Sequence, residues 1–349
     1  MKLFTCKQCG QLLYFENTRC ESCGSTLGFL AEDMELYTLP AQPGNTFSLP
    51  RKSEQYRYCE NAQHQACNWL IPVKQEDPFC EACQLNHTIP NLQEANHMQL
   101  WQKMELAKHR LIYTLLCLHL PLISKTQQSE TGLAFDFKAD RQEAVLTGHD
   151  QGLITLNIAE ADDAERAKRR EEMGEPYRTL LGHFRHEVGH YYWDRLIANS
   201  NFLSSFRSLF GDERQDYSEA LKRHYQQGPP SNWKENFISE YATAHPWEDW
   251  AETWAHYLHL LDTLETAYAF GLQVSPQAAE QDDSMDANMD INPYTLTNFD
   301  DIINLWLPLT FAMNSINRSM GQADMYPFVI PPPVIEKLRF VHQVCHAQK

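Results

Sequence analysis

The string HEVGH at residues 186–190 has the residue types and spacing of a metal-assisted hydrolase. Residues four apart on a helix share one face, so His186 and His190 can direct two ring nitrogens at one zinc ion. Glu187 then lies beside the metal, where a general base takes a proton from water. Apolar residues recur at helical spacing over 177–197 without a proline, which predicts the required helix. The alternative is an ordinary amphipathic helix with two surface histidines.

A hydrolytic zinc site usually has three protein ligands and one open position, so a third ligand must come from elsewhere in the chain. The segment HPWEDWAETWAHYLHL at residues 245–260 is the best candidate. Pro246 suits the first turn of a helix, which puts Glu248 and Glu252 one turn apart on one face. We predict Glu248 as the ligand and Glu252 as the acceptor of a hydrogen bond from a ligand histidine. The alternatives are the reverse assignment, or carboxylates that stabilise the helix N-terminus or face solvent.

An HExxH string followed by a helix with a Glu-x-x-x-acid pattern resembles the gluzincin metallopeptidases. The run Glu248-Asp249-Trp250-Ala251-Glu252 is similar to the third-ligand helix in the catalytic domain of anthrax lethal factor. Tyr241 precedes Glu248 by seven residues, as a tyrosine does in that active site. By resemblance, Tyr241 would donate a hydrogen bond to a developing oxyanion. Its alternative is a core aromatic residue with a satisfied hydroxyl.

Longer stretches, including CNWLIP, FGDERQDY and AHPWEDWAETWAHYLHLL, resemble a bacterial family of zinc-binding metallopeptidases with an N-terminal zinc-ribbon segment. They span most of residues 59–272. In gluzincins a sheet edge beside the active-site helix binds extended substrate by strand addition. By resemblance, the run GLITLNI at residues 152–158 would be that edge; the alternative is an internal strand of a small sheet.

Two CxxC knuckles open the chain and predict a structural zinc site. Its four thiolate ligands would be Cys6, Cys9, Cys20 and Cys23. A glycine follows the second cysteine of each knuckle and eases the approach of backbone N–H groups to sulfur. The alternative is that these four cysteines are free thiols or form disulfides. A disulfide framework is disfavoured in a cytoplasmic protein.

A looser set of four cysteines follows, with one CxxC pair, and predicts a second structural zinc site. These residues are Cys59, Cys67, Cys80 and Cys83, with His64 and His87 as possible substitute ligands. Spacing also permits an interleaved arrangement in which the knuckle at residues 6–9 shares a metal with the pair at residues 80–83.

Composition limits the class of partner. The chain has 349 residues, 43% of them hydrophobic, and a formal net charge of −17 that opposes binding to nucleic acid. Residues 1–90 contain 7 Lys/Arg and 10 Asp/Glu, so the cysteine-rich end is not basic either. The N-terminus shows no secretory signal and the apolar stretch 111–123 is too short to span a bilayer. We expect a cytoplasmic protein with a protein or peptide substrate, a protein partner for the ribbon, and no nucleic-acid or membrane partner.

The expected fold class is α+β and mostly α. A rubredoxin-like zinc ribbon and connector would occupy residues 1–53, and the second cysteine segment residues 54–90. A gluzincin-like helical catalytic domain with a small β-sheet would follow at 91–349. Helical spacing predicts a long helix over 92–120 and helices near 202–209, 217–226 and 233–244. Strands are expected at 133–137, 144–147 and 153–158, the last two joined by a turn over 148–152.

The sequence thus predicts a zinc metallopeptidase with one catalytic zinc and one or two structural zinc ions. His186, His190 and Glu248 would hold the catalytic zinc, with Glu187 as general base. Two alternatives stay open. One is a catalytically silent or gated zinc scaffold that binds a partner. The other is a protease linked to nucleic acid, which the negative charge and the leading position of the ribbon disfavour.

Overall fold

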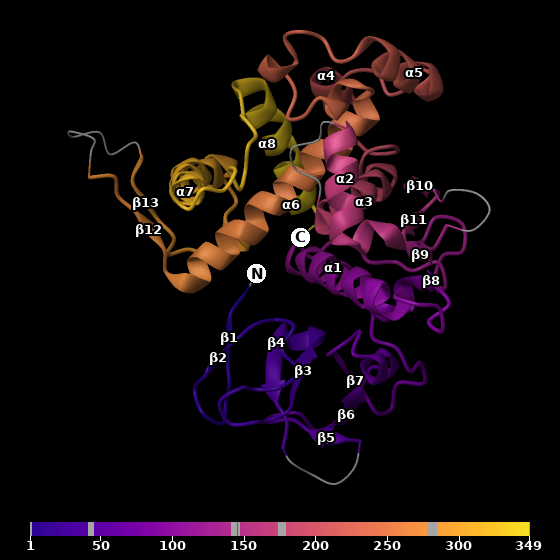
Figure 1. Cartoon of the computed structure of the whole chain (residues 1–349), viewed down its shortest axis with the longest axis vertical. Helices are drawn as coiled ribbons and strands as arrows, with labels where there is room; N and C mark the ends of the chain where they lie inside the picture. The colour runs from indigo at the N-terminus through magenta and orange to yellow at the C-terminus, as the bar shows by residue number, and fades with distance from the viewer. Residues whose placement is uncertain are drawn as a thin grey trace. The chain divides into compact units, whose positions relative to one another are not determined.

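The computed structural model describes residues 2–40, 45–140, 145, 147–173, 179–277 and 285–348 (Figure 1). The chain forms two compact units. The first comprises Met1–Leu116 and Leu122–Lys168, and the second Cys117–Pro121 and Arg169–Lys349. This division into compact units does not bear on the domain boundaries expected after residues 53 and 90, which stay a prediction.

Small antiparallel sheets form the N-terminal part of the first unit. They pair β1 (Phe4–Thr5) with β2 (Leu12–Leu13), β3 (Leu27–Leu30) with β4 (Glu35–Thr38), and β6 (Gln55–Tyr58) with both β5 (Phe47–Ser48) and β7 (Leu70–Pro72). Each of these strands has four residues or fewer. Sheets this small bury little apolar surface, so other contacts must hold the segment together.

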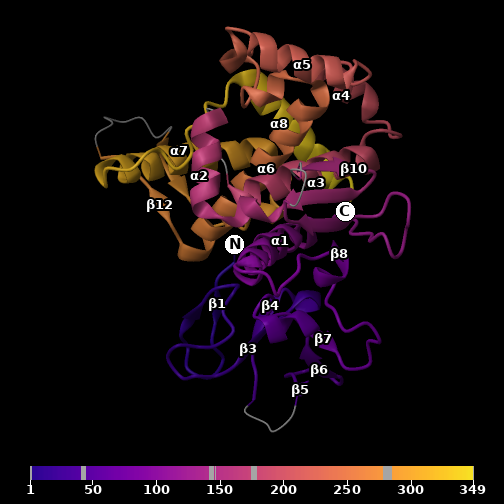
Figure 2. The same cartoon turned by 45° about the vertical axis from the view of Figure 1, so that its right-hand side comes forward.

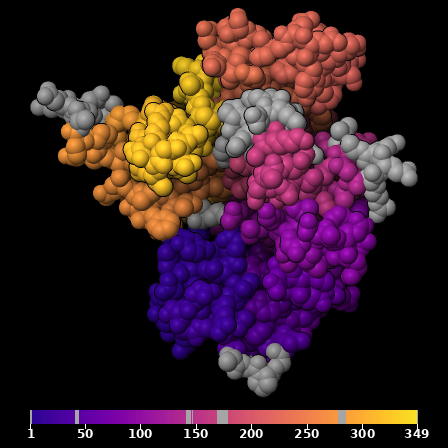
Figure 3. Space-filling view, viewed as in Figure 1, coloured from indigo at the N-terminus to yellow at the C-terminus, as the bar shows by residue number. Residues whose placement is uncertain are grey.

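Helix α1 (His97–Cys117) packs on the aromatic core of this segment. The ring of Tyr113 lies 5.2 Å from that of Phe15, and the ring of His109 lies 5.2 Å from that of Trp69. The space-filling view shows the indigo residues of the N-terminus against the purple residues that follow them (Figure 3). The long helix expected over 92–120 is therefore confirmed, although it starts later and ends earlier than expected. Nearly all of it belongs to the same compact unit as the two cysteine clusters.

A four-stranded sheet completes the first unit. Its order is β10 (Gly148–Asp150), β11 (Leu153–Asn157), β9 (Ala134–Lys138) and β8 (Asn86–Thr88). β11 is antiparallel to β10 and parallel to β9, so the run GLITLNI is an internal strand and not the sheet edge. The expected hairpin exists, but its first strand is at Gly148–Asp150 and its turn is at residues 151–152. Of the strand expected at 144–147, residues 144 and 146 lie outside the described part of the chain.

The second unit is helical. The first unit ends and the second resumes within α2 (Asp163–Met173). The helices that follow are α3 (Leu180–Leu196), α4 (Leu203–Phe210), α5 (Tyr217–Gln227), α6 (Pro246–Phe270), α7 (Phe299–Ser319) and α8 (Pro332–His346). A short hairpin joins β12 (Gln273–Val274) to β13 (Ala287–Asn288). α3 and α8 each pack on α6, and the three helices are neighbours in both cartoon views (Figures 1 and 2).

The helix expected over 233–244 is wrong. The structure has two single 3-10 turns there, Trp233–Glu235 and Tyr241–Thr243. The hydroxyl of Ser239 accepts a hydrogen bond from the backbone N–H of Ala242, a local bond that competes with a continuous helix. This irregular stretch carries Tyr241 into the α3–α6 region.

The fold class predicted from the sequence, α+β and mostly α, is confirmed. Among the described residues, no helix is long and apolar enough to cross a membrane.

Candidate metal centres

Helix α3 presents the two histidines of the HEVGH string on one face. Thr179 begins the helix, with its hydroxyl accepting a hydrogen bond from the backbone N–H of Gly182. One turn separates His186 from His190, and their ring centroids are 4.9 Å apart. The string therefore stands within a regular helix, as the sequence predicts.

Helix α6 brings the third candidate ligand to these rings. His245 caps the helix through a hydrogen bond from the backbone N–H of Trp247, and Pro246 occupies the first turn. Glu248 is buried, and its Oε2 lies 3.0 Å from Nε2 of His186 and 3.5 Å from Nε2 of His190. The carboxylate faces the imidazoles and not solvent. One ligand atom from each of the three residues lies within 4.8 Å of the others.

Glu252, one turn further along α6, contacts the opposite side of the His186 ring. Its Oε1 lies 2.7 Å from Nδ1 of His186, and its Oε2 accepts a 2.6 Å hydrogen bond from the hydroxyl of Ser239. A carboxylate only accepts when ionised, so Nδ1 carries the ring proton and Nε2 is left for a metal. The two carboxylates therefore lie against opposite nitrogens of one ring, and their roles as ligand and support stay a prediction.

Charge is balanced within this group. Burial lowers the pKa of His186, but the nearby carboxylates of Glu248 and Glu252 outweigh it and raise that pKa well above its usual value. Burial raises the pKa of Glu248, but the imidazoles of His190 and His186 outweigh it and hold that pKa well below its usual range. Positive charge between these groups is thus favourable, and a divalent cation supplies it once the rings are neutral.

The two candidate catalytic groups lie near the three ligands. Glu187 is 9% exposed, and within the described residues no hydrogen bond reaches its carboxylate. The Tyr241 ring lies 5.9 Å from the His186 ring. Burial raises the pKa of Tyr241, so its hydroxyl stays protonated and able to donate.

Two aromatic residues surround the ligands, and sequence reasoning missed Tyr217, whereas it expected Trp247 near the site in a core role. The hydroxyl of Tyr217 donates a 2.7 Å hydrogen bond to Oε1 of Glu248. The Trp247 ring lies 4.2 Å from the His190 ring. Asp216 caps α5 by accepting from the backbone N–H of Glu219, and this pattern places Tyr217 at the start of a helix. Nothing in the sequence links that helix to Glu248.

The first cysteine cluster forms as predicted from its spacing. Sulfur–sulfur distances are 3.7 Å between Cys6 and Cys23 and 3.6 Å between Cys9 and Cys20. Gly10 and Gly24 have φ of +78° and +74°, a conformation that glycine adopts without strain. Because the four sulfurs group together, the interleaved arrangement is not the one that the structure adopts.

The second cluster gathers its four cysteines in the interior of the first unit. All four are buried, and the Cys67 and Cys80 sulfurs are 3.7 Å apart. His87 instead contacts Asp136 at 2.7 Å, and the His64 ring packs near Trp101. Neither joins a candidate metal group among the described residues, so their suggested role as substitute ligands is wrong. The histidine at this cluster is His109 of α1.

Comparison with known sequences agrees with both kinds of centre. A family described as "Putative zinc-binding metallo-peptidase" matches residues 97–344, and a zinc-ribbon domain family matches residues 3–94. Proteins from Mycobacterium bovis and Mycobacterium tuberculosis, described only as uncharacterized, are 46% identical over 345 residues. The alignment covers 99% of this chain and 95% of each relative. No solved structure was found to match the chain.

Proposed function

The chain belongs to the zinc-binding metallo-peptidase family, and from this premise we propose that it hydrolyses peptide bonds at the site between α3 and α6. The observation that carries the proposal is the convergence of ligand atoms from His186, His190 and Glu248. Two imidazoles and one carboxylate are the donor set of hydrolytic zinc sites with an open fourth position. A glutamate ligand on a downstream helix makes the proposed enzyme a gluzincin by type.

The residues present fit a zinc ion. Glu248 Oε2 is buried and has no hydrogen-bond donor among the described residues, although both Nε2 atoms are close. The bond between Glu252 and Nδ1 of His186 leaves Nε2 as the ring's free lone pair. Zinc held here would supply Lewis acidity, which makes water acidic near neutral pH and polarises a carbonyl.

Proton transfer is assigned to Glu187. It follows His186 directly on α3 and is outside the set of converging ligand atoms, and its carboxylate is uncommitted. In the proposed mechanism it accepts a proton from the attacking water and later passes that proton to the leaving amine. Tyr241 donates its hydroxyl hydrogen to the carbonyl oxygen as negative charge develops there.

The remaining proposals concern location and stoichiometry. Among the described residues no cysteine forms a disulfide, which suits a reducing cytoplasm. We assign one zinc to the α3–α6 site and one to each cysteine cluster. The substrate is a protein or peptide, and the ribbon binds a protein partner.

Glu187→Gln tests the mechanism. An amide cannot accept the proton, so we expect loss of peptide cleavage by at least about 100-fold with unchanged zinc content. Cleavage of a broad peptide library is followed by mass spectrometry, and zinc per chain by elemental analysis. Glu219→Gln, an exposed change on α5, is the matched control.

Full activity in Glu187→Gln would remove this residue from the mechanism. A zinc-loaded wild type that cleaves no member of the library would instead support the catalytically silent scaffold. His190→Ala separates the sites, because it should lose one zinc and keep the two held by cysteines.

A further inference from the structure

The second cysteine cluster carries a charge that its surroundings must compensate. Its four sulfurs are buried, and one divalent zinc with four thiolates leaves two negative charges in the protein interior. Hydrogen-bond donors aimed at the sulfurs are the usual compensation, and they also orient the ligands. The source of these donors therefore decides which elements belong to the site.

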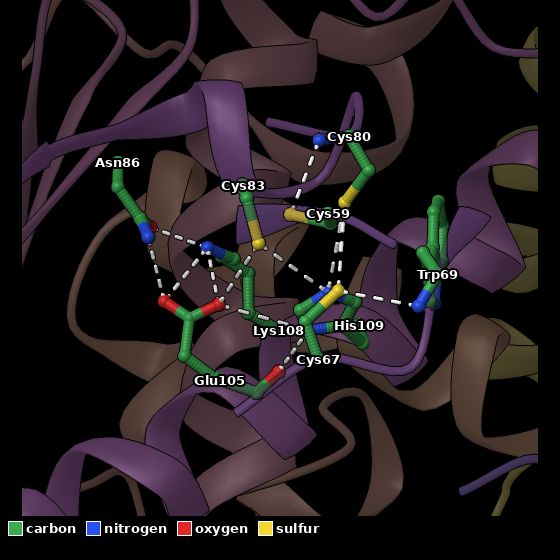
Figure 4. A network of polar contacts seen from close by, with 9 residues as sticks. All are labelled: Cys59, Cys67, Trp69, Cys80, Cys83, Asn86, Glu105, Lys108 and His109. Atoms are coloured by element: carbon green, nitrogen blue, oxygen red, sulfur yellow. Dashed lines mark hydrogen bonds and ion pairs between the residues drawn. The ribbon is translucent and has the colours of Figure 1, made fainter. Parts of the chain in front are cut away.

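Among the residues that the structure describes, backbone N–H groups donate to two of the four sulfurs. The N–H of Trp69 donates to the Cys67 sulfur and that of Cys80 to the Cys59 sulfur, both at 3.3 Å (Figure 4). Among the described residues, the nitrogen that contacts the sulfurs of Cys80 and Cys83 is Nε2 of His109, at 4.0 and 3.7 Å. Both distances are within hydrogen-bond range for sulfur.

The other ring nitrogen of His109 is fixed by its own helix. Nδ1 lies 2.6 Å from the backbone carbonyl oxygen of Glu105, and a carbonyl can only accept, so Nδ1 carries a hydrogen. The ring also packs against Trp69. Its orientation therefore directs Nε2 at the sulfurs. His109 is not part of the four-sulfur group and instead groups with Cys83 and Glu105. Four thiolates complete a tetrahedral zinc site without it.

The neighbouring charges cancel one another. Oε2 of Glu105 lies 3.8 Å from the Cys83 sulfur, but it is 2.9 Å from the ammonium of Lys108. The amide of Asn86 donates to Oε1 of Glu105 at 2.7 Å and its oxygen accepts from Lys108 (Figure 4). Lys108, Asn86 and Glu105 thus pair with one another, and Oε2 of Glu105 also lies 3.7 Å from Nδ1 of His109. His109 remains as the donor for two thiolates.

We propose that His109 is a positioning residue of the second metal site: as an imidazolium with a hydrogen on each ring nitrogen, it donates from Nε2 to the sulfurs of Cys80 and Cys83 and holds both as zinc-bound thiolates. The site then extends beyond the zinc-ribbon match at residues 3–94 into α1, which lies in the metallo-peptidase match. Zinc in this cluster ties α1 to the cysteine-rich segment.

The rate of metal release, measured separately at each cysteine, tests this role. Full-length zinc-loaded protein is exposed to excess EDTA and pulse-alkylated, and peptide mass spectrometry gives a labelling rate for each cysteine. His109→Leu keeps apolar bulk but removes the donor. Loss of such an outer partner typically weakens metal binding by about 10- to 100-fold. We expect faster labelling by that factor at residues 59, 67, 80 and 83, and unchanged labelling at residues 6, 9, 20 and 23.

Two further variants separate hydrogen bonding from packing. His109→Gln keeps an amide N–H and should restore most of the slow release. His64→Leu, at a half-buried ring against Trp101 in the same unit, should release zinc at the wild-type rate. Wild-type labelling in His109→Leu would overturn the proposal. So would equal acceleration at all eight cysteines, or a Gln variant that releases zinc as fast as the Leu variant.

Discussion

The two glutamates of α6 contact opposite nitrogens of one imidazole because they are one helical turn apart. Oε2 of Glu248 lies 3.0 Å from Nε2 of His186, whereas Oε1 of Glu252 lies 2.7 Å from Nδ1. The hydroxyl of Ser239 donates a hydrogen bond to the second oxygen of Glu252. A swap of the two roles would leave Ser239 without this acceptor. These contacts, and not the helical spacing, distinguish the proposed ligand from its proposed support.

Tyr217 supports Glu248 as Glu252 supports His186, and this yields a prediction. Tyr217→Phe removes the hydroxyl that donates to Oε1 of Glu248 but keeps the ring that packs near His245 and Trp247. We expect the α3–α6 site to bind zinc about tenfold more weakly, because a ligand carboxylate loses its orienting bond. Competition with a chelating dye measures the change.

Tyr225→Phe is the control for this experiment, since it makes the same change on the same helix at a side chain that is 66% exposed. Its zinc affinity should equal that of the wild type. An unchanged affinity in Tyr217→Phe would show that the Tyr217 hydroxyl does not orient the ligand.

Sequence reasoning located the part of this site that is local in the chain. His186, Glu187 and His190 lie within five residues, and the Glu248–Glu252 spacing lies within one helix. Tyr217 contacts Glu248 across 31 residues, from a different helix and past the irregular segment 233–244. Such contacts depend on tertiary packing, which spacing does not encode.

At the scale of elements, the approach of α3 to α6 depends on Gly189, the fourth residue of the HEVGH string. A Cβ at this position would lie 3.1 Å from Cα of Ala251 and 3.2 Å from Cβ of Trp254. The indole N–H of Trp250 also donates a 2.8 Å hydrogen bond to the carbonyl oxygen of Gly189. Contact at this distance lets a carboxylate on one helix reach the imidazoles on the other.

Gly189→Ala should therefore destabilise the protein, although alanine is the better helix former. Overpacking against a backbone atom costs about 1–3 kcal/mol, against a gain of about 1 kcal/mol from helix propensity. We expect a net loss of about 1 kcal/mol, or about 2–4 °C in Tm by calorimetry. Gly148→Ala is the control, since no heavy atom lies within 4 Å of its added Cβ. A variant at position 189 as stable as the wild type would mean that the two helices can separate freely.

Elements with a strong periodic pattern were predictable and those held by local side-chain bonds were not. The helices at 97–117 and 180–196 follow from their apolar spacing, and Pro246 marks the start of α6. Residues 233–244 have apolar side chains at helical spacing, yet Ser239 bonds the backbone there and breaks the helix. The sequence placed β11 beside a neighbouring strand, but its internal position depends on parallel pairing with β9.

At the scale of the whole molecule, the two compact units rely on different sources of stability. The second unit contains long helices that pack on α6, whose apolar side chains are largely buried. In the first unit the cysteine-rich segment has strands of two to four residues, and its eight cysteines form two clusters. In a segment of this kind, the free energy of metal binding contributes directly to the free energy of folding. Zinc removal should then affect one unit far more than the other.

Hydrogen exchange of the full chain with and without a strong chelator measures this difference. Structural zinc contributes about 10–16 kcal/mol in zinc-finger peptides, so loss of both cysteine-held ions should remove protection at β3, β4, β6 and β7. Helix α1 should lose protection as well, because His109 and Tyr113 pack on that segment. Residues 254–264 of α6, beyond the metal ligands, should keep their slow exchange, since apolar packing holds them. Equal loss of protection in the two regions would show a single cooperative structure, and retained protection at β3 and β4 would show a ribbon that folds without zinc.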